Sequence, residues 1–371
     1  MKIKTNEFIP DIFRNRKFSI EELGDKIKVS SKIFGKSGSN PKSIILPKQI
    51  ELNGSFAEAI GLYIGDGKLT ERDLRHSSFG NKDEDIIKFM LEFFVKTMNI
   101  PLDKMTLTIT YRIGDGSVSK KKWSNILGVC SEKFKLKQSN RIKNDMLTIQ
   151  INSTIFRIFL KNMIACLLIK FKENVILRRG FLRGYFAAEG TIGFNKKENF
   201  LNYIGFAYNP LKEHSLRNYC IECLNLENIE SKYKERTGNR AEIIITKWSN
   251  YSKLWKVGLF DRCDRKKNIF DEILYTRKVY CKLNNKFRKR FFGCISLTQR
   301  NIADLTNSWQ GNICRVLSGN NLITINQLKT LSNYSNYSEE SILENIKSVR
   351  IGTTKIFIYD REFIEYLFKG N

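Results

Sequence analysis

Two apolar stretches of this sequence carry the same pattern: SFAEAIGLYIGDG at residues 55–67 and GFLRGYFAAEG at residues 180–190. In each stretch a glycine stands five residues before an acidic residue, and a second glycine directly follows that acid. The two acids are Asp66 and Glu189. We expect both stretches to be helices that end at their acids, because a glycine directly after the last turn commonly stops a helix.

The spacing of small residues predicts that these two helices pack against each other. A glycine inside a helix costs about 1 kcal/mol relative to alanine, so an internal glycine needs a structural reason. Small residues four positions apart let two helix backbones approach closely. Ala57, Gly61 and Gly65 have this spacing in the first stretch, and Gly184 and Ala188 repeat it in the second. Packing through these faces would place the two acids side by side.

Such a pair of acids is unfavourable without a cation. Two carboxylates ~5 Å apart repel each other by roughly 3 kcal/mol at an effective dielectric constant near 20. Each carboxylate would also lie at the negative end of its helix dipole. Hard oxygen ligands without a nearby histidine suit Mg²⁺, and metals held in this way can assist hydrolysis of a phosphodiester. The pair therefore predicts a Mg²⁺ site, in which Mn²⁺ can substitute.

The segments that follow the two stretches are also alike. Ser55 is expected to cap the first helix, with Glu58 completing a capping box. Each half then reads as helix, strands, helix, strands, helix, with strands near residues 74–79, 106–112, 203–207 and 241–246 and helices at 83–98 and 211–224. A repeat of about 120 residues with this content predicts a pseudo-twofold α+β domain.

The charge of the chain indicates a polyanionic partner. Sixty-four Lys and Arg residues against 38 Asp and Glu residues give a formal charge of +26, which favours nucleic acid. Only two histidines are present, which excludes His-rich zinc sites and most catalytic triads. Cys220 and Cys223 have helical spacing and are expected to be buried thiols. The most apolar run, residues 155–169, is too short and too charged to span a bilayer, so a soluble intracellular protein is expected.

With both motifs and both acids in place, the chain resembles the single-chain LAGLIDADG homing endonucleases over about residues 45–280. The resemblance implies two αββαββα repeats, whose saddle-shaped antiparallel sheets lie in the major groove of a long asymmetric site in double-stranded DNA. It also implies a monomer that makes a staggered double-strand break with Mg²⁺. Ile60 and Arg183 depart from the motif, which has a small residue there. We expect Arg183 to point away from the helix pair.

The resemblance also implies roles for individual residues. Asp66 and Glu189 would be metal ligands, helped by the backbone carbonyls of Gly65 and Ala188. A polar residue at the start of the second helix of each half matches Asn81 and Asn209. A lysine near the metals matches Lys267, with Lys266 as the next candidate in the second half and Lys170 or Lys172 in the first.

Residues 293–371 differ in character from the rest of the chain. They carry eight Lys and Arg against seven Asp and Glu, so the net charge lies upstream. Residues 297–317 have helix-turn-helix spacing, with Thr298 as N-cap, Ala303 at the helix crossing and Asn307 in the turn. The second helix would present Gln310, Asn312 and Arg315 to DNA. A wing is expected at residues 349–351 and 355–359, although the low charge also suits a protein-binding module.

The chain therefore divides into a basic arm at residues 1–50, repeats at 51–172 and 173–280, a basic linker at 281–292 and a mostly helical C-terminal domain of helix-turn-helix or winged-helix type at 293–371. Polar alternation in the strands predicts DNA contacts at Arg72, Arg75, His76, Arg112, Lys135, Lys137, Lys196, Lys232, Lys234 and Arg236. Two alternatives stay open: a DNA-binding regulator that has lost cleavage, and a maturase that binds intron RNA.

Overall fold

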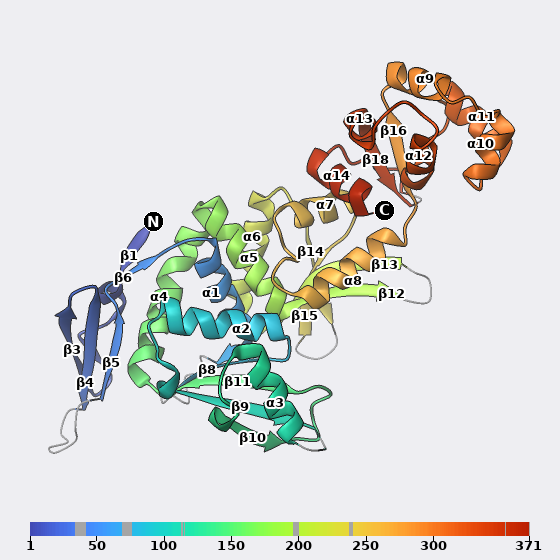
Figure 1. Cartoon of the computed structure of the whole chain (residues 1–371). Helices are drawn as coiled ribbons and strands as arrows, with labels where there is room; N and C mark the ends of the chain where they lie inside the picture. Colours follow the sequence, from blue (N-terminus) through green and yellow to red (C-terminus); the bar gives the residue numbers. More distant parts are fainter. Residues whose placement is uncertain are drawn as a thin grey trace.

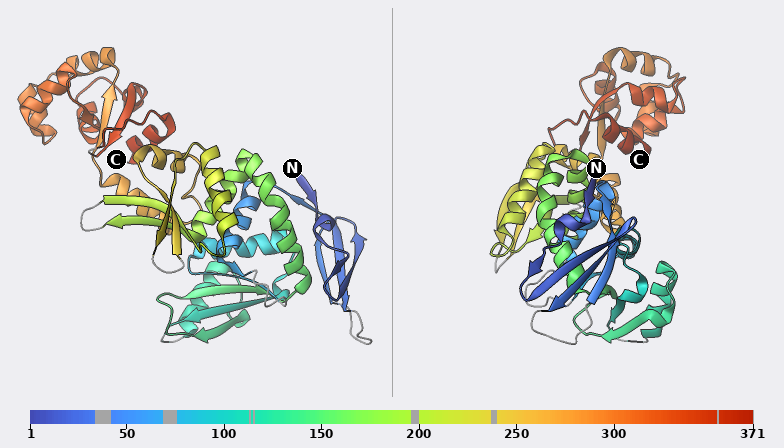
Figure 2. Two further views of the ribbon diagram at one scale, coloured as in Figure 1. Left: turned by 180° about the vertical axis from the view of Figure 1, so that it is seen from behind. Right: turned by 90° about the vertical axis from the view of Figure 1, so that its left-hand side faces the viewer.

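The computed structural model describes residues 1–33, 42–68, 76–112, 114, 116–195, 200–236, 240–352 and 354–370. Figure 1 shows a small N-terminal sheet on one side, a central body of two sheets with helices, and a C-terminal domain on the other side. Figure 2 shows the same order from behind, so the two ends of the chain flank the central body. Three of the expected DNA contacts, Arg72, Arg75 and Lys196, lie outside the described residues.

Two helices, α1 (Gly54–Asp66) and α5 (Val175–Glu189), pack together in the centre, as the glycine spacing predicts. Their N-caps are asparagines. The Asn53 side chain accepts a hydrogen bond from the amide of Phe56 at 2.9 Å, and Asn174 caps α5 in the same way. The expectation that Ser55 caps α1 was wrong, because the extended residue before the helix is Asn53 and Ser55 already lies in the first turn.

The first half contains a five-stranded sheet in the order β10-β9-β11-β8-β7. In chain order, the strands, helices and turns of this half are β7 (Gly67–Lys68), β8 (Ser77–Asn81), α2 (Glu84–Glu92), the π-helical turn η2 (Phe93–Thr97), η3 (Leu102–Lys104), β9 (Met105–Tyr111), α3 (Gly116–Leu127), η4 (Ser131–Lys133), β10 (Phe134–Gln138), β11 (Met146–Ile151) and α4 (Thr154–Glu173). The expectation of a wholly antiparallel sheet fails at β10, which pairs with β9 in parallel. The crossover through α3 returns the chain to the same end of the sheet, which requires parallel pairing.

The second half contains a four-stranded antiparallel sheet in the order β12-β13-β15-β14. Its elements are β12 (Gly190–Asn195), β13 (Phe200–Tyr208), α6 (His214–Leu226), β14 (Lys232–Arg236), β15 (Arg240–Ile245), α7 (Trp248–Lys256) and α8 (Asp264–Tyr275). The corresponding strands of the first half have the same order, β7-β8-β11-β9, with β10 added at the outer edge. Both sheets therefore follow one connection scheme after a central helix that ends in an acid.

The described residues up to Glu51 form two small sheets, so the expectation of a basic arm was wrong. Four antiparallel strands lie in the order β2-β3-β4-β5, with the bounds β2 (Ile12–Phe13), β3 (Arg16–Leu23), β4 (Lys26–Ile33) and β5 (Lys42–Pro47). A separate pair, β1 (Lys2–Lys4) and β6 (Gln49–Glu51), joins the beginning of this segment to its end. Ile27, Val29 and Leu46 are buried. The 3-10 turn η1 (Thr5–Phe8) fastens the sheet to α4, where the Phe8 carbonyl accepts a hydrogen bond from the amide of Asn162.

The C-terminal domain begins earlier than expected, and the region expected to be a linker is structured. Strand β16 lies between β17 and β18 and includes residues assigned to the linker. The elements are β16 (Val279–Leu283), α9 (Asn285–Gly293), α10 (Gln299–Leu305), α11 (Gln310–Ser318), β17 (Ile323–Thr324), α12 (Ile325–Ser332), α13 (Glu339–Glu344), β18 (Ile346–Ile351) and α14 (Arg361–Gly370). Four of the five basic residues at 281–292 lie on α9, whose apolar side buries Phe287 and Phe291, and the fifth, Lys282, lies on β16.

The local predictions for residues 297–317 agree with the structure. Thr298 caps α10, Ala303 is buried, and Asn307 has a positive φ of 47° between α10 and α11. Val349 and Ile358 exchange two backbone hydrogen bonds at the expected wing. Cys220 and Cys223 are buried in α6, also as expected. Among the described residues no helix is both long and apolar enough to cross a membrane.

Candidate active site

Close contact between α1 and α5 brings the two acids together. A side chain at Gly184 would overlap the backbone carbonyl of Glu58, and one at Gly61 would come within 2.8 Å of the backbone nitrogen of Tyr185. A side chain at Gly65 would likewise overlap that of Ala188. The residues that precede the two acids are thus in contact at the ends of their helices. Glycine is required here because the neighbouring atoms belong mostly to backbone, which cannot move aside.

Both motif acids have raised pKa values, and the charge of Asp66 contributes to the shift of Glu189. Burial raises the pKa of Glu189 to about 7, and the negative charges of Asp66 and Glu213 add to the shift. Burial also raises the pKa of Asp66 above its ordinary value. A nearby cation would therefore stabilise the ionised form of both carboxylates and lower their pKa values.

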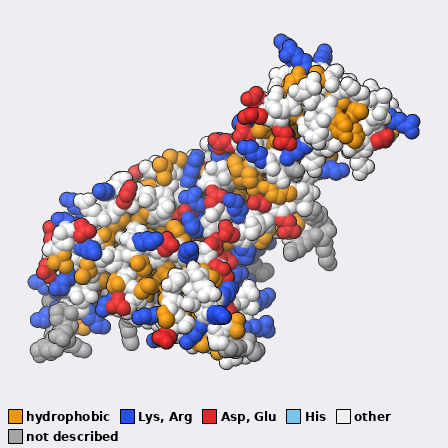
Figure 3. Space-filling model, in the orientation of Figure 1, with side chains coloured by type: hydrophobic (Ala, Val, Ile, Leu, Met, Phe, Trp, Pro, Cys, Tyr) orange, Lys and Arg blue, Asp and Glu red, His pale blue; other side chains and the backbone are white. Residues whose placement is uncertain are grey.

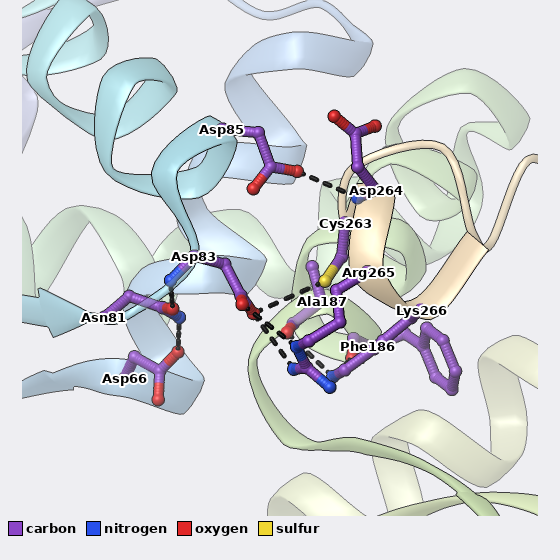
Figure 4. A network of polar contacts seen from close by, with 10 residues as sticks. All are labelled: Asp66, Asn81, Asp83, Asp85, Phe186, Ala187, Cys263, Asp264, Arg265 and Lys266. Atoms are coloured by element: carbon purple, nitrogen blue, oxygen red, sulfur yellow. Dashed lines mark hydrogen bonds and ion pairs between the residues drawn. The ribbon is translucent and has the colours of Figure 1, made fainter. Parts of the chain in front are cut away.

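Asp66 is held by a chain of polar contacts that crosses from one half to the other (Figure 4). The side-chain amide of Asn81 donates to Asp66 at 2.7 Å, and the side-chain oxygen of Asn81 accepts from the backbone nitrogen of Asp83 at 2.8 Å. Arg265 of α8 donates twice to the Asp83 carboxylate, at 3.0 and 2.9 Å. Although burial acts in the opposite direction, these Arg265 contacts lower the pKa of Asp83. Arg265 of the second half thus helps to position Asp66 of the first half, through Asp83 and Asn81.

The lysine at this site is Lys266 rather than Lys267. The Lys266 ammonium donates to the carbonyls of Phe186 at 2.6 Å and Ala187 at 2.8 Å, in the last turn of α5. Its side chain is buried, and burial lowers its pKa to about 8. Lys267 instead points elsewhere, with its nitrogen 3.6 Å from Asp261. The assignment therefore moves by one residue, because adjacent residues on a helix face directions about 100° apart.

Glu189 lies in a separate cleft of the second half with Asn209, Glu213, Tyr203 and Arg236. The side-chain oxygen of Asn209 accepts from the amide of Leu211, as Asn81 accepts from the amide two residues on. The Asn209 backbone nitrogen donates to Glu213 at 2.6 Å. Asp66 lines its own cleft with Asn81, Arg265 and Lys266. Each cleft therefore holds one motif acid and one asparagine, but the cleft of Asp66 is lined by both halves, whereas that of Glu189 is lined by the second half.

The donor set fits a hard divalent cation. Both acids end their helices, where backbone carbonyls such as those of Gly65 and Ala188 have no partner within the helix. Among the described residues no group of three or more His, Cys, Asp and Glu side chains could hold a metal ion. Two carboxylates with carbonyls, water and a substrate phosphate match the way Mg²⁺ is bound in proteins, where it keeps several waters.

Arg183 crosses the helix pair, contrary to the expectation that it points away. It donates to the buried carboxylate of Glu58 at 2.7 Å, and Arg262 contacts the other oxygen of the same group. Glu58 therefore does not complete a capping box. A charge in the apolar motif helix is accommodated because a carboxylate on the facing helix neutralises it.

Several expected DNA contacts lie on the outer strands of the two sheets. Lys135 and Lys137 are exposed on β10, and Lys232 and Lys234 are exposed on β14. Each of these strands is the last in its sheet. Arg236, at the end of β14, donates twice to Glu242 on β15.

The remaining candidates lie at strand ends or in the C-terminal domain. His76 directly precedes β8, and Arg112 directly follows β9. On α11, Gln310 and Arg315 are exposed, whereas Asn312 donates to Ser308 at 3.0 Å and accepts from Asn321. The amide of Asn312 is thus already used to join α11 to neighbouring loops.

Four polar residues of the site were not predicted from the sequence: Asp83, Asp85, Glu213 and Arg265. Asp85 accepts from the backbone nitrogen of Asp264 at 3.0 Å, which docks the start of α8 onto the start of α2. A signal was present for two of them, because Asp85 and Glu213 both stand four residues after the expected asparagines. Arg265 carried no comparable signal.

The sequence matches no family model and no curated protein. In structure it is similar to mesophilic variants of the homing endonuclease I-DmoI, at 17% identity over 55% of this chain and 88% of that chain, with a TM-score of 0.35. I-DmoI in complex with DNA and Mn is similar at 15% identity over 55% and 96%, with a TM-score of 0.35. Full-length DUF199/WhiA from Thermatoga maritima is similar at 13% identity over 76% and 93%, with a TM-score of 0.34.

Proposed function

We propose that this protein is a DNA endonuclease of LAGLIDADG type that uses Mg²⁺, or Mn²⁺ in its place, to cut both strands of a specific site. The observation that carries the proposal is the pair Asp66 and Glu189. Two separate halves bring these acids together at the ends of contacting helices, where burial raises the pKa of each. A purely structural role does not require two half-buried carboxylates that repel each other.

A bound divalent ion would polarise the scissile phosphodiester and activate water for in-line attack. Asp66 and Glu189 would hold such ions, with the carbonyls of Gly65 and Ala188 as further donors. Asn81 keeps the Asp66 carboxylate in one orientation. Lys266 places a positive charge beside both acids. Its fixed position would favour a phosphate group in the cleft that it lines with Asp66.

Two clefts with one motif acid each support cleavage of two strands by one chain. The repeated strand order supports the interpretation as two LAGLIDADG repeats at residues 51–172 and 173–280, which would act as a monomer. The exposed lysines of β10 and β14 lie on the outer edge of each sheet, where they would contact the phosphates of a long duplex.

The C-terminal domain is proposed to be a second DNA-binding module of helix-turn-helix type. The turn between α10 and α11 supports this, with Asn307 in the left-handed region and Gln310 and Arg315 exposed on α11. Asn312 is not proposed as a base contact, because its side chain is bound within the domain.

The test is cleavage of a randomised duplex library by the purified full chain with Mg²⁺, compared with EDTA. Cuts that require both acids would support the proposal, so Asp66→Asn and Glu189→Gln should each abolish double-strand breaks. The exposed acids Asp103 and Glu340 supply matched controls, Asp103→Asn and Glu340→Gln, which should cut normally.

Enrichment of one DNA sequence without cleavage, unchanged by either motif substitution, would instead indicate a DNA-binding regulator. Preference for folded intron RNA over duplex DNA in a competition assay would indicate a maturase. Either result would refute the nuclease proposal.

A further inference from the structure

The N-terminal sheet has strongly separated charges along its strands. Its far end, at the turn between β2 and β3 and at the described ends of β4 and β5, carries five basic residues, here called the tip cluster: Arg14, Arg16, Lys17, Lys32 and Lys42. At the other end, the ion pairs among described residues join Lys28 to Glu21 at 3.2 Å and Lys48 to Glu22 at 2.7 Å. The acids of β3 therefore neutralise the other end, and the tip cluster keeps an excess of positive charge over the one acid beside it, Asp11.

The strand register places basic side chains on both faces of the tip. Lys17 is directly opposite Lys32, so these two share one face. Lys42 pairs with Ser31, the residue before Lys32, and Arg16 precedes Lys17, so both lie on the other face. Like charges directly opposite each other in a sheet are destabilising, which means that the fold gains nothing from the Lys17–Lys32 pair.

The sheet is fixed to the body, and its tip points toward the same side as the candidate site. The Phe8 and Phe159 rings pack edge to face at 6.3 Å, which joins the sheet to α4. In Figure 1, α1 descends from the end near β6, and the tip of the N-terminal sheet also points down. The last residue of α1 is Asp66. Figure 3 shows Lys and Arg side chains beside the grey residues at the lower left, over this end of the sheet.

We propose that the tip of the N-terminal sheet inserts into a groove of duplex DNA beyond the part covered by the first half. A groove has phosphates along both walls, and the major groove is about 12 Å wide, close to the roughly 10 Å thickness of one sheet layer. Basic side chains on both faces of a sheet match such a pair of walls, whereas contact with a flat polyanion would need only one basic face. This inference rests on the proposed DNA-binding function and extends it to a flanking contact outside the two repeats.

The test measures the salt dependence of binding to a random-sequence 60-base-pair duplex in EDTA, so that cleavage plays no part. Each phosphate contact contributes about 0.9 to the slope of log K against log salt concentration. The double variant Lys17→Ala/Lys32→Ala should lower the slope by about 2, and Arg16→Ala/Lys42→Ala on the other face should do the same. The quadruple variant should lower it by about 4. The matched control, Lys28→Ala/Lys48→Ala, should leave the slope unchanged because these lysines are already paired with acids.

Two results would overturn the proposal. One is an unchanged slope in the quadruple variant, and the other is a lower slope in only one of the two double variants. A thermal melt monitors folding, and the Lys17→Ala/Lys32→Ala variant should melt no lower than the wild type, since it removes a like-charge pair. The outcome is separable from that of the nuclease proposal. Wild-type protein that binds DNA but never cuts would refute cleavage and leave the slope comparison valid, whereas tip variants that cut with an unchanged slope would refute only the groove contact.

Discussion

Replacing Glu189 by glutamine should abolish activity and at the same time stabilise the metal-free protein at alkaline pH. The pKa of Glu189 is raised to about 7 from an ordinary 4.5, by burial first and then by the charges of Asp66 and Glu213. A carboxyl whose pKa is raised by folding contributes stability below its unfolded pKa, and this stability is lost as the pH rises through the folded pKa. The wild type should therefore lose stability between about pH 4.5 and 7.

The magnitude follows from the shift. The rise of the Glu189 pKa from 4.5 to about 7 corresponds to about 3.5 kcal/mol, since a tenfold change in an equilibrium constant equals about 1.4 kcal/mol. The cleft is open to water, so we expect about half of this, or about 1.7 kcal/mol, as the gain in Glu189→Gln at pH 8.5. At pH 4.5 the wild-type carboxyl is protonated, and the two proteins should have nearly equal free energies of unfolding.

The assay is urea unfolding at pH 4.5 and 8.5 in EDTA, followed by circular dichroism and tryptophan fluorescence. Glu340→Gln, at an exposed position, should change the free energy of unfolding by the same small amount at both pH values. Adding Mg²⁺ at pH 8.5 should stabilise the wild type more than Glu189→Gln. A variant that is less stable than the wild type at pH 8.5, or that shows the same change at both pH values, would contradict the proposed electrostatic strain.

Three further substitutions test the geometry of the site. Gly184→Ala should destabilise the chain by about 3 kcal/mol, because the methyl group would overlap backbone of α1; in thermal denaturation it should contrast with Gly293→Ala, whose methyl meets no atom within 4 Å. Lys266→Ala should remove Mg²⁺-dependent cleavage while Lys267→Ala keeps it, and equal activity of the two variants in a plasmid assay would refute the reassignment. Arg265→Ala should slow cleavage of one strand more than the other, so that nicked DNA accumulates on gels; an equal loss on both strands would show that the contact supports the fold in general.

Sequence alone indicated the helix pair and the meeting of its two acids. The reason is that this information is local: glycines four residues apart along a helix lie on one face, and an acid just before a terminal glycine lies at the helix end. The same applies to Asn81, Asn209 and the turn at Asn307, whose positions follow from the residues beside them. Local pattern thus predicts these positions both at the candidate site and, for Asn307, in the C-terminal domain.

Tertiary structure decided which side chains complete the site and how the flanking regions fold. Choosing Lys266 over Lys267 required the rotation of α8 relative to α5, and the pairs Arg265–Asp83 and Arg183–Glu58 join residues far apart in the chain. In the same way, β4 and β5 belong to a sheet because they bury Ile27, Val29 and Leu46 together, and β16 is a strand because β18 pairs with it. Ion pairs and strand pairing depend on partners that are distant in sequence, so a residue's neighbours along the chain do not specify them.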